Sequence, residues 1–355
     1  MHKSEILHFC STTVVYLCRK NELVKKVSIL IAARNEATNI LECLQSVEAL
    51  TYPKTHLQVL VGDDASTDET ADIVRNFIHN KPHFKLVTIT HTLPNLKGKT
   101  NVLAQLAHQA TGDYLFFTDA DIEVPTDWIQ EMLRHFKPNV GVVTGITTMK
   151  TPTFLHGGLA LFQGMEWLFY LSLMRLFGLF GIPVTAMGNN MATTRQAYDA
   201  VGGYEGIPFS ITEDYALFRA ILEKGFRFEQ LFDRRVLTIS KPVPTFRELL
   251  IQRKRWMYGA MSLPWGQRIG VYLNGLLIPI LLVLALFFPK TALFLTFASY
   301  VFTTAWLVGS LSWLQLNTLL LGAPFFWFYH LGMNFTMLIN FYTTKNTQWK
   351  GRNYF

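Results

Sequence analysis

Short apolar runs alternate with helical patterns between residues 27 and 150. Runs rich in β-branched and aromatic residues predict strands, whereas apolar residues spaced three or four apart predict helices. The predicted strands are Val27–Ala33, Gln58–Gly62, Phe84–Thr90, Tyr114–Thr118 and Val140–Gly145, and the predicted helices are Asn39–Ala49, Glu69–His79 and Thr100–Ala110. This alternation is typical of an α/β fold with a doubly wound sheet, whose ligands bind at the carboxyl ends of the strands.

The segment from Phe154 to Ile182 is very apolar but contains Glu166 and Arg175. Two charges in the middle of a membrane span are costly, so the pattern favours an amphipathic helix lying on the bilayer surface. We therefore expect residues 154–182 to form an interfacial segment.

Two later stretches, Ile269–Pro289 and Thr291–Thr344, contain no Asp, Glu, Lys or Arg. Because a span needs about 20 apolar residues, the first stretch fits one transmembrane helix and the second fits two. Pro279 and Pro324 are expected to kink these helices; a buried helical core of a soluble protein is the alternative. The expected organisation is an N-terminal extension (1–26), an α/β domain (27–268), transmembrane helices (269–344) and a basic tail (345–355).

The composition supports a membrane protein. Half of the 355 residues are hydrophobic and 16% are charged, below the roughly 25% charged residues of soluble domains. The net charge is +7, and six basic residues precede the apolar stretches: Lys241, Arg247, Arg253, Lys254, Arg255 and Arg268. Their position indicates the cytoplasmic flank of an integral membrane protein, with the plasma membrane as the expected location, rather than a nucleic-acid partner.

The topology stays open at this point. Three spans would place the basic tail, with Lys345, Lys350 and Arg352, on the side opposite the α/β domain, against the positive-inside tendency. One apolar segment could instead be re-entrant. The apolar run Ser11–Cys18 is too short for a span and lacks a cleavage pattern, and the cysteines form no Cys-x-x-Cys pair for zinc.

Polar residues follow the first two predicted strands. Arg34, Asn35 and Glu36 come after the first strand, where such side chains can contact a base, ribose or phosphate. Asp63 and Asp64 come after the second, and Asp64 could accept a hydrogen bond from a uracil or ribose. Ordinary strand-to-helix turns, with Thr67 or Asp68 as a helix cap, explain the same residues without function.

Asp119-Ala120-Asp121 ends the fourth predicted strand and is the most informative motif. Alternation along a strand sends Asp119 and Asp121 to the same side. Paired carboxylates suit Mg²⁺ or Mn²⁺, whose other positions stay available for water and a diphosphate. A simple acidic turn is the alternative.

Thr212-Glu213-Asp214 begins a predicted helix, where acids are common caps. A carboxylate there could also accept the proton of an attacking hydroxyl. The P-loop resemblance of Gly98-Lys99-Thr100 fails because the required first glycine would fall at Leu93. The loop could still bring Lys97 or Lys99 to a phosphate.

Gln252-Arg253-Lys254-Arg255-Trp256 lies in a helical pattern that puts Gln252, Arg255 and Trp256 on one face. Arg255 could bind a phosphate while Trp256 stacks on a sugar. Arg253 and Lys254 point elsewhere, and we expect them to contact lipid headgroups. A solvated basic helix beside the membrane is the alternative.

In order along the chain, six motifs resemble those of membrane-bound family-2 glycosyltransferases, which include ceramide glucosyltransferases and the cellulose, chitin and hyaluronan synthases. They are AARNE (32–36), DDAST (63–67), DAD (119–121), GNNMA (188–192), TED (212–214) and QRKRW (252–256). WKGR (349–352) resembles the tail of non-processive lipid glycosyltransferases. Such relatives usually begin with a transmembrane helix, and none is expected before Val27.

The resemblance implies a GT-A fold and an inverting transfer from a nucleotide sugar, with UDP-sugar the expected donor and Mg²⁺ or Mn²⁺ the expected cofactor. It makes Asp214 the catalytic base and Asp119 and Asp121 the metal ligands. The implied nucleotide-sugar-binding residues are Ala33, Arg34, Glu36, Asp64, Lys99 and Asp119, and those for the diphosphate and acceptor are Asn189, Asn190, Glu213, Gln252, Arg255 and Trp256.

The expected acceptor is a lipid or lipid-linked molecule at the cytoplasmic membrane face, because the apolar 154–182 segment lies beside the expected site and the membrane tail is short. A processive polysaccharide synthase is the alternative, since QxxRW occurs in both groups. A membrane scaffold that keeps the fold without activity is a third hypothesis, which predicts no metal-dependent binding of nucleotide sugars.

Overall fold

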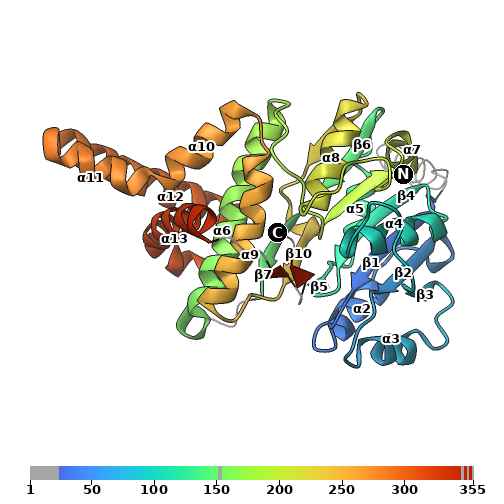
Figure 1. Cartoon of the computed structure of the whole chain (residues 1–355). Coiled ribbons are helices and arrows are strands. Elements are labelled where there is room, and N and C mark those ends of the chain that lie inside the picture. The colour runs from blue at the N-terminus through green and yellow to red at the C-terminus, as the bar shows by residue number, and fades with distance from the viewer. Residues whose placement is uncertain (1–23, 151–153, 345–347, 350–351, 354–355) are drawn as a thin grey trace, which may run out of the picture.

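The computed structural model describes residues 24–150, 154–344, 348–349 and 352–353. A seven-stranded sheet with the strand order β3-β2-β1-β4-β8-β6-β9 forms the centre of the N-terminal part (Figure 1). Its strands are β1 (Val27–Ala33), β2 (Leu57–Asp63), β3 (Phe84–Thr88), β4 (Tyr114–Asp119), β6 (Val140–Thr144), β8 (Met191–Thr194) and β9 (Arg227–Gln230). Only β8 runs antiparallel to its neighbours. The predicted α/β class with a mixed sheet is confirmed.

Helices cover both faces of this sheet, which explains why β1 is apolar apart from the buried Ser28. Ile29 and Ile31 pack on one side and Leu30 on the other, as alternation along a strand requires. One face is covered by α2 (Ile40–Glu48), α3 (Thr70–Ile78) and α5 (Trp128–Leu133). The other is covered by α4 (Lys99–Gln109), α7 (Arg195–Ala200) and α8 (Glu213–Glu223).

A small second sheet extends the first toward the C-terminal helices. It has the order β5-β10-β7 and consists of β5 (Ile122–Glu123), β10 (Leu237–Ser240) and β7 (Ile146–Met149). The tail forms a two-stranded pair of β11 (Gln348–Trp349) and β12 (Arg352–Asn353). Three 3₁₀ helices, η2 (Lys54–His56), η3 (Arg234–Val236) and η4 (Asn317–Gly322), complete the connections.

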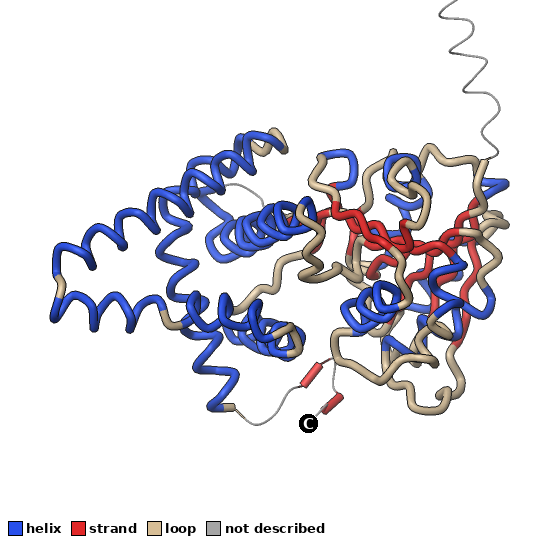
Figure 2. Tube along the Cα trace, turned by 90° about the horizontal axis from the view of Figure 1, so that it is seen from above, coloured by secondary structure: helices blue, strands red, loops and turns tan. Residues whose placement is uncertain are grey.

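The C-terminal part is helical and lies to one side of the strands (Figure 2). It begins with α6 (Phe154–Leu179), whose Leu161, Met165 and Leu168 share a core with later helices. The later helices are α9 (Phe246–Met261), α10 (Trp265–Gly275), α11 (Leu277–Phe287), α12 (Pro289–Trp313) and α13 (Ala323–Thr343). The middle of α6 is covered by protein, and its exposed apolar side chains gather at the end, with Phe177 and Leu179.

Of the two prolines expected to kink a helix, only Pro279 lies next to a bend. The ring of a helical proline conflicts with the carbonyl four residues earlier, and a 65° bend separates α10 from α11 at Leu276, just ahead of Pro279. Pro324 lies in the first turn of α13, where a proline is tolerated, so the expected kink there is wrong.

One helix, α12, is long and apolar enough to cross a membrane, and the bent pair α10–α11 would make a second if it counts as one span. In the part of the chain that the structure describes, the three expected spans are therefore not confirmed. The bent pair fits the re-entrant alternative as well as a broken span. Helices α11 and α12 project from the rest of the molecule (Figure 1). Exposed apolar side chains nevertheless cover them, including Leu286, Phe287 and Leu293.

Gly62 in β2 allows α4 to approach the sheet closely. A Cβ at this position would come too near the Cγ1 atom of Val102 on α4. We predict that Gly62→Ala destabilises the protein by about 1–3 kcal/mol, because the added methyl overpacks a core without free space. Thermal unfolding of the purified protein measures this, with Gly309→Ala as the control, since a Cβ at Gly309 meets nothing within 4 Å. Equal unfolding temperatures for both variants would contradict the close packing of α4.

Candidate active site

A cavity of about 1120 Å³ lies at the carboxyl ends of β1, β2 and β4, between the sheet and the C-terminal helices. Arg34 and Glu36 reach it from the loop after β1 and Asp64 from the loop after β2. Asp119 and Asp121 reach it from the end of β4. Residues that follow three neighbouring strands therefore converge, as the rule for open α/β sheets requires.

The loops after β1 and β2 hold each other in place. The Asp64 backbone N–H donates to the Ala33 carbonyl at 2.9 Å, and the Arg34 guanidinium donates to the Asp64 carbonyl. Asn35 and Ala65 both adopt φ = 52°, a left-handed conformation that is unusual for alanine. Backbone strain of this kind is found where a loop is held for ligand contact.

The Glu36 side chain is buried at this loop. It accepts a hydrogen bond from the Asn39 side chain at 2.7 Å, just before α2. Its backbone N–H donates to the Thr70 hydroxyl at the start of α3. Glu36 thus ties the β1 loop to the helices on both sides of it.

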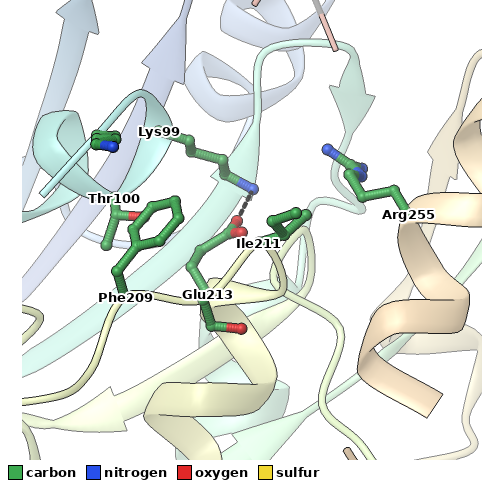
Figure 3. Close-up of a pocket in the computed structure, with 8 residues that line it drawn as sticks. Lys99, Thr100, Phe209, Ile211, Glu213 and Arg255 are labelled. Carbon is green, nitrogen blue, oxygen red and sulfur yellow. Dashed lines mark ion pairs between the residues drawn. The ribbon is translucent and has the colours of Figure 1, made fainter. Parts of the chain in front are cut away.

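Lys99 connects the two acidic parts of the cavity. Its Nζ lies 2.6 Å from Asp119 Oδ1 and 2.8 Å from Glu213 Oε1. Burial alone would lower the pKa of Lys99, but the two carboxylates raise it well above its usual value, so the side chain stays charged. Figure 3 shows Lys99 and Glu213 facing each other, while Arg255 approaches from α9.

Asp119 and Asp121 both line the cavity, whereas Ala120 between them is buried. Asp121 accepts a hydrogen bond from the Ser240 hydroxyl at 3.3 Å, which links β10 to the site. Within the described ranges, no group of three or more Asp, Glu, His or Cys side chains is arranged to hold a metal. Two carboxylates beside open space suit a cation such as Mg²⁺ that takes its other ligands from a diphosphate and water.

Asp214 lies in the first turn of α8 and lines the same cavity. Its carboxylate accepts hydrogen bonds from the backbone N–H groups of Gly188 and Tyr215, both at 2.8 Å. A Cβ on residue 188 would lie 2.8 Å from the Asp214 Cβ, so this approach needs glycine. Burial and the neighbouring Glu213 carboxylate raise the pKa of Asp214 to about 6. Such a carboxylate is ionised at neutral pH and is more basic than a solvated one.

The α9 motif meets the cavity from the helical side. Gln252, Arg255 and Trp256 all line it, as the helical spacing predicts. Arg253 also lines it: its guanidinium donates to the Gln252 side chain at 2.7 Å and lies 4.0 Å from the Trp256 ring centroid. Trp167 of α6 packs edge-on against Trp256.

Arg253 and Lys254 do not extend toward lipid headgroups, so that expectation is wrong. Arg253 is fully buried and donates to Glu166 at 2.8 and 3.2 Å, and Glu166 also accepts from the Tyr329 hydroxyl. Lys254 is buried and donates to the Thr344 carbonyl. Buried charges need such partners. Arg253 and Glu166 are 87 residues apart, so no local sequence pattern indicates their pairing.

Other members of the basic group also have contacts inside the protein. Lys241 lines the cavity, and its Nζ atom lies 3.3 Å from Glu42 Oε2. Arg253 and Lys254 are buried, and Arg255 and Lys241 line the cavity. Most of the six basic residues between positions 241 and 268 therefore make contacts within the protein. Their charge carries little information on membrane orientation.

Asn189 lines the cavity, but Asn190 does not reach it. Asn190 is fully buried, donates to the carbonyls of Ile146 and Val236, and accepts from the Trp128 indole. It joins β7, η3 and α5 behind the site, so its expected contact with the diphosphate or acceptor is replaced by a structural one.

Apart from Asn190, the cavity gathers every residue that the sequence analysis assigned to the site. These are Ala33, Arg34, Glu36, Asp64, Lys99, Asp119, Asp121, Asn189, Glu213, Asp214, Gln252, Arg255 and Trp256. Residues that sequence reasoning missed also line it, notably Ser240, Lys241, Glu166 and Trp167. The last two belong to a segment interpreted only through its hydropathy.

The chain belongs to the family described as glycosyl transferase family 21, whose sequence model matches residues 7–355. This confirms the resemblance to family-2-like glycosyltransferases that was drawn from the motifs and their order.

Curated relatives match about two thirds of the chain. The chain is 31% identical to the beta-monoglucosyldiacylglycerol synthase of Nostoc sp. over 66% of its length and 48% of that protein. The chain is also 28% identical to the poly-beta-1,6-N-acetyl-D-glucosamine synthase of Staphylococcus epidermidis, and the match covers 68% of this chain and 56% of that protein. The matched region thus spans about half the length of these relatives.

Among solved structures, the fold resembles that of the mannosyltransferase PcManGT from Pyrobaculum calidifontis, which was determined with GDP-Man and Mn²⁺. The TM-score is 0.56 at 19% identity, over 96% of this chain and 97% of that chain. The expected GT-A fold is therefore confirmed.

We predict that Asn190→Ala weakens the fold more than Asn189→Ala. The first change removes partners from buried carbonyls and an indole N–H, at about 1–3 kcal/mol for each unsatisfied group. The second changes a neighbouring side chain whose amide oxygen accepts one bond, from Thr147. Unfolding temperatures of the two variants measure the difference. An Asn190→Ala protein of full stability with impaired ligand binding would instead restore Asn190 to the site.

Proposed function

We propose that the protein is an inverting, metal-dependent glycosyltransferase that moves a sugar from a nucleoside diphosphate, with UDP-sugar the favoured donor, to a lipid or lipid-linked acceptor. The observation that carries this proposal is the position of Asp214. It lies in one cavity with Asp119 and Asp121, and Lys99 bridges Asp119 to the neighbouring Glu213. A base and an acidic pair suited to a divalent cation are thereby in reach of a single ligand.

In the proposed reaction, Asp214 accepts the proton of the acceptor hydroxyl. The hydroxyl oxygen forms a bond to the anomeric carbon as the bond from that carbon to the diphosphate breaks. The nucleoside diphosphate leaves with the electron pair, and attack from the opposite side inverts the anomeric centre. The hydrogen bonds from Gly188 and Tyr215 orient the carboxylate for this transfer.

Asp119 and Asp121 would hold Mg²⁺ or Mn²⁺, which supplies charge neutralisation for the departing diphosphate. Lys99 sits against Asp119 and is suited to add a positive charge there. We assign Ala33, Arg34, Glu36 and Asp64 to the nucleotide, because they line the same end of the cavity.

On the opposite wall we assign the diphosphate and acceptor to the α9 motif and its neighbours. Arg255 can form paired hydrogen bonds with phosphate oxygens, and Gln252 and Trp256 lie on the same face. Glu213 and Asn189 line the cavity near Asp214 and complete this set. Arg253 holds Gln252 and Trp256 in position from behind.

The lipid acceptor is supported by the apolar surface of the helical part. Leu286, Phe287 and Leu293 are among the exposed side chains on α11 and α12. Apolar surface on this scale suits a bilayer. We propose that these helices anchor the protein, with the active site at the cytoplasmic face of the plasma membrane. The name of the Nostoc relative, a diacylglycerol glycosylating synthase, agrees with a lipid acceptor.

A processive polysaccharide synthase is the second candidate, because the Staphylococcus epidermidis relative bears the name of one. The two candidates differ in product length. Single-sugar products on a gel support lipid glycosylation, whereas a ladder of polymers supports the second candidate.

We predict that Asp214→Asn lowers transfer at least about a hundredfold, within the usual contribution of a general base, while nucleotide-sugar binding persists. In the native enzyme, kcat/KM should fall as the pH drops below about 6, because protonation of Asp214 removes the base. Release of nucleoside diphosphate from a panel of nucleotide sugars, with membrane lipids as acceptors, measures both. Unchanged release by Asp214→Asn would exclude the proposed mechanism.

We predict that Asp121→Asn or removal of divalent ions with a chelator weakens nucleotide-sugar binding, because the diphosphate loses its cation. Calorimetry with Mn²⁺ and a panel of nucleotide sugars measures this. Thr126→Ala, at a residue outside the cavity lining, serves as the matched control. Binding that is equally strong without metal would contradict the assignment of Asp119 and Asp121, and the absence of any donor binding would support the scaffold hypothesis.

A further inference from the structure

The cavity continues well beyond the carboxylate site. Its volume of about 1120 Å³ exceeds the roughly 300–1000 Å³ typical of small-molecule sites. Besides the strand ends, residues of α6, α9, α10 and α13 line it. The apolar side chains among the residues of α6, α9 and α10 and the turn between α9 and α10 form what we call the apolar arm: Leu171, Met174, Phe177, Met257, Leu263 and Val271. Polar residues of α10 and α13 belong to the same lining, among them Asn274 and Asn334.

The apolar arm opens at an apolar rim. Phe177 and Ile182 line the cavity and are 44% and 41% exposed. On the α10 side, Trp265 adjoins the lining residue Gly266 without lining the cavity itself; it is 63% exposed, and the Arg268 guanidinium lies 5.3 Å from its ring centroid. The Gln267 amide donates to the Pro183 carbonyl at 3.1 Å and so joins α10 to the chain after α6. The opening is thus framed by apolar groups on two connected segments.

Two glycines form part of the wall on α10. Gly266 and Gly270 lie one turn apart, which puts them on the same face of the helix, and both line the cavity. A Cβ at either position meets nothing within 4 Å. Larger side chains would therefore be accepted by the fold but would project into the arm.

We propose that the apolar arm holds a hydrocarbon chain of the acceptor lipid, and that Gly266 and Gly270 keep it wide enough for that chain. This inference rests on the proposed function, because it adds the binding site for the acceptor's tail to the site for its hydroxyl group. The arm leads to Asp214 at one end and to the exposed apolar rim at the other. A lipid would fit this arrangement with its hydroxyl group at Asp214, its hydrocarbon chain in the apolar arm and the end of that chain at the exposed apolar rim.

The test compares Gly266→Leu and Gly270→Leu with Gly309→Leu. A Cβ at Gly309 also meets nothing within 4 Å, but this residue of α12 does not line the cavity. All three changes improve helix propensity, so the variants should fold. The probe is a hexadecyl alcohol that carries a diazirine on its chain; after irradiation, mass spectrometry locates the labelled residues. Calorimetry with nucleotide sugars is run on each variant.

We expect labels on α6 and α10 residues of the arm in the native protein and in Gly309→Leu. Leucine at 266 or 270 should reduce them about tenfold or more, because one buried leucine competes with the chain for the same space, while donor binding is unchanged. Labels confined to α11 and α12, or equal labelling in all variants, would overturn the proposal. Labelling of the arm together with full activity of Asp214→Asn would support the lipid site and contradict the proposed mechanism. Transfer to soluble acceptors without labelling of the arm would support the mechanism and contradict the lipid site.

Discussion

The site depends on the pairing of Lys99 with two acids from distant parts of the chain. Asp119 ends a central strand and Glu213 begins α8, and the Lys99 ammonium lies within 2.8 Å of both. Carboxylates that converge in a buried space repel one another unless a positive charge lies between them. Lys99 supplies that charge and keeps the acidic groups close enough to act on one ligand.

The α/β part could be predicted from the sequence because its signals are local. A strand such as β1 is almost entirely apolar because helices cover both of its faces, and the polar residues that follow it, Arg34 and Glu36, line the cavity at the carboxyl ends of the strands. The same rule brought Asp64, Asp119 and Asp121 together. The sequence did not predict that Asn190 is buried behind the site, because two adjacent asparagines give no indication of which side chain faces the cavity and which enters the core.

The helical part was harder to predict because its polar residues find partners far along the chain. Glu166 suggested a helix that avoids the bilayer interior, yet its charge is matched by Arg253, and the same carboxylate oxygen, Oε2, also accepts a hydrogen bond from the Tyr329 hydroxyl. Hydropathy also does not register a bend, so the uncharged stretch from Ile269 to Pro289 resembled one helix although Pro279 divides it into α10 and α11. Spacing within α9 was reliable, since Gln252, Arg255 and Trp256 needed only the helical period.

The Glu166 cluster determines how the chain can be divided. Because Arg253 and Tyr329 both contact Glu166, α6, α9 and α13 form one polar core, surrounded by leucines of α12 and η4. A shortened chain that ended after α9 would keep the whole sheet but would expose this core and remove the carbonyl partner of Lys254. Cutting away the C-terminal helices would thus disturb the helix that carries Trp256, and a working sample needs the intact chain.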